Sequence, residues 1–105
     1  MTLLENHFVE VSQEVNTYLD TQMANFMKGI GTQDNDILSK TVQDPNELDS
    51  LLTRLNNAYD LIKDHCIPYC RIIHNIIDSK VEAFAEALAK FAMASILLDD
   101  GLVRE

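Results

Sequence analysis

Six side chains that can bind a metal ion or act as nucleophiles lie close together in the middle of the chain. The stretch DHCIPYCRIIHNIID contains Asp64, His65, Cys66, Cys70, His74 and Asp78. A spacing of four residues places Cys66, Cys70 and His74 along one face of a helix, and two thiolates with an imidazole suit zinc. A structural zinc site needs a second pair of ligands, however, and Pro68 disturbs the turn between the thiols. We therefore expect buried free thiols that act as small apolar side chains. The alternatives are a zinc site at these three residues and redox chemistry of the cysteines.

Paired acids are the other candidates for chemistry. Glu10 and Glu14, and likewise Glu82 and Glu86, lie one helical turn apart and could share a divalent cation or a proton. Neither pair has the Glu-x-x-His companion of a di-metal site in a helical bundle. The stretch Gly29–Gly31 lacks the length and the Lys of a phosphate-binding loop, and no serine lies in a nucleophile elbow. The sequence therefore predicts no enzyme activity and no cofactor.

The charge balance limits the class of partner. The chain of 105 residues has 17 acidic residues against 8 Lys and Arg, a formal net charge of −9. Because affinity for nucleic acid comes largely from Lys and Arg, direct nucleic-acid binding is not expected. The scattered acids most simply form solvated helix faces. The alternative is a small acidic inhibitor, of the kind that phages encode, which occupies a basic groove of a nucleic-acid-processing target. Its acidic partner surface would include Asp34, Asp36, Asp60 and Asp64.

Apolar periodicity predicts a first helix over residues 2–28. Thr2 and Glu5 form a capping-box pattern at its start, and Gly29 and Gly31 are expected to end it. A polar, acidic linker over residues 29–44 should follow. Every third or fourth residue of this helix falls on one mostly apolar face, which contains Leu4, Phe8, Val11, Val15, Leu19, Gln22 and Phe26.

A second helix is predicted over residues 45–67. Asp44 can cap this helix, and Pro45 suits its first position because a proline there loses no helical hydrogen bond. The packing face of the helix contains Leu48, Leu52, Leu55, Tyr59, Ile62 and Cys66.

Pro68 decides how the second helix joins a third, predicted over residues 69–98 and followed by a frayed tail at 99–105. A proline must end or bend a helix. Because no polar loop separates Cys66 from Ile73, we favour one long helix kinked at Pro68 over a tight reversal. The expected fold is a single all-α domain over residues 1–105, an antiparallel bundle of three main helices.

The stretch Val81–Leu98 is apolar on most of its circumference, with its charges Glu82, Glu86 and Lys90 confined to one strip. These charges disfavour a membrane span. A helix of this kind is covered on more than one side, and the chain is short of segments that could cover it. The predicted interaction surface contains Ile77, Val81, Phe84, Leu88, Phe91, Met93, Ile96 and Leu97.

The predicted function is a non-catalytic protein–protein interaction module, such as an adaptor, an assembly subunit or a small chaperone. It would dock through the apolar C-terminal helix on a protein partner or on a second copy, with a homodimer as the simplest form. Two cysteines without a signal-peptide pattern indicate a reducing, cytoplasmic setting.

Overall fold

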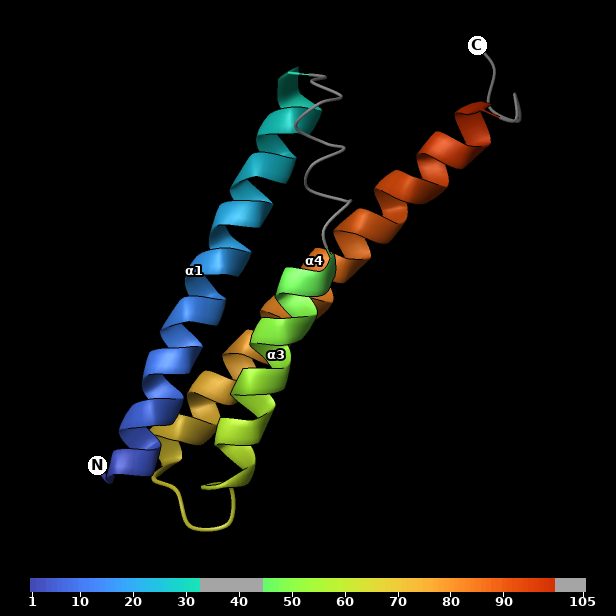
Figure 1. Cartoon of the computed structure of the whole chain (residues 1–105). Coiled ribbons are helices and arrows are strands. Elements are labelled where there is room, and N and C mark those ends of the chain that lie inside the picture. Colours follow the sequence, from blue (N-terminus) through green and yellow to red (C-terminus); the bar gives the residue numbers. More distant parts are fainter. Residues whose placement is uncertain (33–44, 100–105) are drawn as a thin grey trace.

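The computed structural model describes residues 1–32 and 45–99, with side chains at 1–32 and 47–91. It contains the helices α1 (Leu3–Thr32), α3 (Pro45–Asp60) and α4 (Pro68–Asp99). Figure 1 shows that α1 and α4 run in the same direction and that α3 runs opposite to both. The expected all-α bundle of three helices is confirmed.

The N-terminal turn of α1 has the predicted capping box. The Thr2 N–H donates to Glu5 Oε1 at 2.8 Å, and the Glu5 N–H donates to Thr2 Oγ1 at 3.1 Å. At its other end α1 continues through Gly29 to Thr32, so the prediction that glycines end this helix at about residue 28 was wrong. A glycine inside a helix costs only about 0.5–1 kcal/mol. Gly29 is buried and lies three residues from the buried Phe26, on the same face of α1.

The chain reverses before Pro68, which corrects the expected kink. Helix α3 starts at Pro45 as predicted but ends at Asp60, earlier than the predicted residue 67. The Ile62 N–H and the Lys63 N–H both donate to the Tyr59 carbonyl, at 2.9 and 2.8 Å, and tighten the turn. Pro68 is then the first residue of α4, where its missing N–H and fixed φ suit a helix start. The polar residues of this turn, Lys63, Asp64 and His65, are exposed and precede Cys66, whereas Ile62 is buried in the core.

The core lies along α1, which packs against both other helices. Its buried members come from α1, α3, the α3–α4 turn and α4: Phe8, Val11, Val15, Leu19, Leu55, Ala58, Ile62, Cys70, Ile77 and Phe84. At about 1.5 Å per residue, α3 is about 24 Å long and α1 about 45 Å. Helix α3 therefore runs beside only part of the two long helices (Figure 1), and the molecule is a rod of 58 × 21 × 20 Å.

Two sets of polar contacts join α1 to its neighbours. Arg54 Nη1 of α3 lies 2.9 Å from Glu14 Oε2 of α1. Lys80 Nζ of α4 lies 2.9 Å from Asp20 Oδ1 and also donates to Asn16 Oδ1, both on α1. Among the helices that the structure describes, none is long and apolar enough to cross a membrane.

Candidate interaction surface

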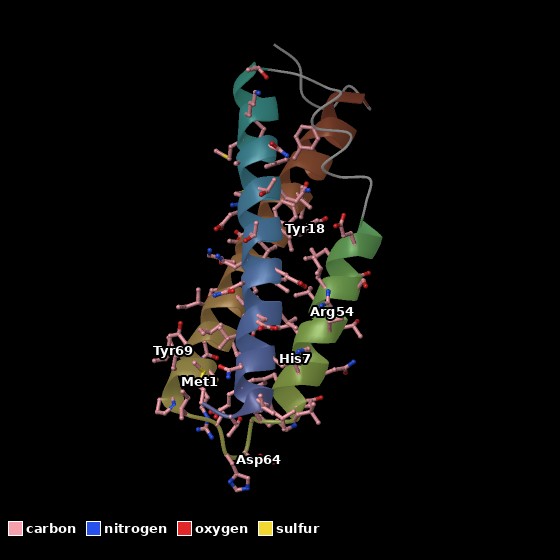
Figure 2. The ribbon with its side chains drawn as sticks, turned by 60° about the vertical axis from the view of Figure 1, so that its left-hand side comes forward. Met1, His7, Tyr18, Arg54, Asp64 and Tyr69 are labelled. Carbon is pink, nitrogen blue, oxygen red and sulfur yellow. The ribbon has the colours of Figure 1, made fainter. Side chains whose placement is uncertain are left out.

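Helix α4 has two apolar faces in its first half. The inner face, Cys70, Ile77 and Phe84, is buried in the core. The outer face, Tyr69, Ile72 and Ile76, is exposed at 52%, 55% and 50%. These outer positions follow the i, i+3, i+7 spacing of a helix stripe, so they form one continuous apolar surface. In Figure 2 Tyr69 lies on the side of α1 opposite Arg54 and α3.

An open groove runs between α1 and α4 beside this outer face, with a volume of about 190 Å³. We call it the α1–α4 groove. On α1 it is lined by Val9, Ser12, Gln13 and Asn16, and on α4 by Tyr69, Ile73, Ile76 and Ile77. None of these eight residues is charged. The groove can therefore accept an apolar side chain. At its α1 wall the Gln13 side chain is exposed, whereas Ser12 is buried and its hydroxyl donates to the Phe8 carbonyl.

At the polar end of the α1–α4 groove, the positive charge of Lys80 is paired with a carboxylate of the same chain. Asn16, which lines the groove, accepts a hydrogen bond from Lys80 Nζ, and the Lys80 charge is paired with Asp20. The Asn16 amide also donates to Asp20 at 3.4 Å. This network joins α1 to α4 and leaves no net charge from the pair at the end of the groove.

The opposite side of α1 has a different character. A shallow depression between α1 and α3, the α1–α3 groove, is lined by Glu10, Gln13, Glu14, Thr17, Tyr18, Glu47 and Leu51. Three of these side chains are acids, and among the side chains that the structure describes only that of Glu14 has its charge paired, with Arg54 of α3. This groove suits a basic group, whereas the α1–α4 groove does not.

Glu5 connects the start of α1 to the chain reversal. Its side chain is buried, and its second oxygen accepts the Ile67 N–H at 2.9 Å, directly before Pro68. The hydrogen bonds from the Thr2 and Ile67 backbone amides lower the pKa of the Glu5 carboxyl. Glu5 therefore acts as a charged connection between two segments that are far apart in sequence.

The three zinc candidates have separate environments. Cys66 lies half-buried in the reversal, where its Sγ faces the Lys63 carbonyl at 4.0 Å. Cys70 is buried, and burial together with the negative charge of Glu5 raises the pKa of its thiol. Within residues 1–32 and 45–99, no three His, Cys, Asp or Glu side chains are grouped to hold a metal. The reversal before Pro68 breaks the single helical face on which the zinc alternative depended.

His74 takes part in aromatic packing. Its ring stacks on Tyr59 of α3, with centroids 3.9 Å apart and planes 11° from parallel. Phe8 of α1 lies 5.4 Å from Tyr59 and 6.4 Å from His74, so each helix contributes one ring. His74 Nδ1 also lies 3.4 Å from Asp78 Oδ2 on the same helix. This cluster holds the inner face of α4 against α3.

The residues of the predicted interaction surface divide into two groups. Ile77 and Phe84 are buried in the core of the chain, and Val81 and Leu88 are half-buried against it. Phe91 is half-buried and packs edge-on against Phe26 at 5.7 Å. Ile77 and Phe84 are therefore not available as an exposed surface, whereas Val81, Leu88 and Phe91 are each partly exposed. The side chains of Met93, Ile96 and Leu97 lie outside the described residues.

The predicted acidic partner surface is only partly described. Asp34 and Asp36 lie outside the described residues. Asp60 is 3.5 Å from Lys63, and Asp64 is exposed at the tip of the reversal (Figure 2). The structure therefore does not gather these four acids into one described patch.

Sequence reasoning missed Tyr69, Ile72 and Ile76 as surface residues. The signal was present, because the stretch from Tyr69 to Ile77 has more apolar positions than one helical stripe can bury. We expected the excess apolar surface in the second half of the helix instead.

No known protein family, curated protein or solved structure matched the chain.

Proposed function

We propose that the chain is a non-catalytic helical interaction protein that docks on another protein surface through the outer face of α4. The observation that supports this most strongly is the exposure of Tyr69, Ile72 and Ile76, three large apolar side chains that adjoin each other on one helix face. Contiguous apolar patches on a folded protein usually mark sites of association.

The α1–α4 groove supports the same proposal. It lies beside the exposed stripe and gives the surface a concave part, which a side chain of a partner can fill. A partner helix laid along this groove would bury the stripe in the way that amphipathic helices occupy apolar grooves. The two free cysteines fit a reducing compartment, and a cytoplasmic location belongs to this proposal.

Site-specific photo-crosslinking in the native cells tests the proposed surface. A photoreactive phenylalanine derivative at Ile72 should give discrete protein adducts. The matched control is the same group at Asn57, an exposed residue of α3. Equal adducts from both positions, or none from Ile72, would count against the outer face of α4 as the docking surface.

A further inference from the structure

We propose that the occupant of the outer face of α4 is a second copy of this chain, which packs antiparallel to the first across a two-fold axis. This inference rests on the proposed function and names its partner. The two copies would bury Tyr69, Ile72 and Ile76 of each chain, together with the half-buried Ile73, against the same four residues of the other, as closed homodimers do.

Charge distribution favours a second copy over a basic partner at this face. Each chain has a net charge of −9, so two copies can pack closely only where acids are absent from the contact. The eight residues that line the α1–α4 groove are uncharged. A basic partner would instead gain most at the α1–α3 groove, where Glu10 and Glu47 lie open to solvent.

The acidic residue of α4 nearest to its outer face points away from that face. Asp78 is the one acid in the sequence from Pro68 to Lys80. It follows Ile76 by two residues, about 200° around the helix, and its carboxylate faces His74, which stacks on Tyr59 of α3. A second copy on the outer face therefore meets no carboxylate of α4 within this half of the helix.

The spacing of the apolar residues is compatible with two-fold symmetry. An axis that passes between Ile72 and Ile73, perpendicular to α4, places Tyr69 of one copy opposite Ile76 of the other. The same axis places Ile72 opposite Ile73. The i, i+3, i+4, i+7 spacing thus repeats itself when the helix is reversed, as an isologous interface requires. Such a surface is small, and we expect a dissociation constant on the order of 10 µM.

Sedimentation equilibrium of the purified chain tests the second copy. The chain should be a dimer at roughly tenfold above this dissociation constant and a monomer at roughly tenfold below it. Ile76→Asp should weaken the dimer at least tenfold while helicity by circular dichroism is unchanged, because Ile76 is half exposed in the single chain. Asn57→Asp adds the same charge on exposed α3 and should leave the dimer unchanged.

Salt gives a second readout. Because the like charges of the two chains repel, added salt should strengthen or leave unchanged a dimer, whereas it would weaken a complex with a basic partner. A monomer at all these concentrations, or a dimer that Ile76→Asp leaves intact, would overturn the second copy as partner. If the chain is a monomer and the Ile72 crosslinks trap a different protein, the proposed function remains and this inference falls.

Discussion

The inner and outer faces of α4 differ although they are built from the same residue types. Ile76 and Ile77 are neighbours in sequence, yet Ile77 is 2% exposed and Ile76 is 50% exposed. Both residues line the α1–α4 groove, but Ile77 also packs in the core, whereas half of the Ile76 side chain is open to solvent. The difference teaches that hydrophobicity alone does not distinguish a buried residue from an exposed one. What distinguishes them is which side of α4 is covered by α1.

The largest difference between the faces should appear when each isoleucine is shortened. Ile77→Ala should lower the free energy of unfolding by about 3 kcal/mol, because it leaves a cavity in a closed core. Ile76→Ala should lower it by less than about 1 kcal/mol, because water already reaches that side chain. Urea denaturation at a concentration where the chain is a monomer measures the free energy of unfolding of both variants. Equal losses would remove the distinction between the faces.

The aromatic cluster at the border of the inner face should give the next effect. His74→Ala removes the ring stacked on Tyr59 and should cost about 1 kcal/mol, whereas His74→Phe keeps a ring and should cost less. Thermal or urea unfolding compares the two variants with the parent chain. If His74→Phe is as destabilising as His74→Ala, stacking is not what holds α4 to α3 here.

Glu5 makes stability depend on pH. Because its pKa is lowered in the folded chain, its contribution is present above the unfolded value of about 4.3 and is lost as the pH falls through the lower folded value. Glu5→Gln cannot ionise, so the parent chain should be the more stable at pH 7, and the difference should shrink in acid. Urea midpoints from pH 7 to pH 3 measure it. A difference that stays constant with pH would contradict a charged Glu5 connection.

The smallest losses of stability should come from the two sets of polar contacts that join α1 to α3 and α4. Lys80→Met removes contacts to both Asp20 and Asn16 and should cost about 0.5–1 kcal/mol, whereas Arg54→Met removes one exposed ion pair and should cost about 0–0.5 kcal/mol. Both losses should decrease in 1 M salt. Urea unfolding at low and high salt checks the order, and a larger loss for Arg54→Met would reverse it.

The helical faces could be predicted from the sequence because they follow local periodicity. Five of the seven residues on the predicted face of the first helix are buried: Phe8, Val11, Val15, Leu19 and Phe26. Leu4 of the same face is 48% exposed, and Gln22 is half-buried. The capping box and the start of α3 at Pro45 were also predictable, since each depends on only a few neighbouring residues. The buried Glu5 was expected only as a cap, because its bond to Ile67 joins residues 62 positions apart.

The outcome at Pro68 could not be predicted from local pattern. A proline fits both a kink and a helix start, and the choice depends on whether Ile62 of the turn and Cys70 of α4 can reach the same core. The reversal then turned the expected interaction residues Ile77 and Phe84 inward and left Tyr69, Ile72 and Ile76 outside. The location of the surface therefore depended on tertiary structure.

An isotope-filtered NMR experiment tests the central claim, that the outer face of α4 joins two copies, most directly. In a mixture of ¹³C-labelled and unlabelled chains, the Tyr69 ring of one copy should show nuclear Overhauser effects to the Ile76 methyl groups of the other. Within one helix these residues are seven positions and about 10 Å apart, too far for this contact. Intermolecular signals that connect α3 instead, or no intermolecular signals at dimer-forming concentration, would contradict the account.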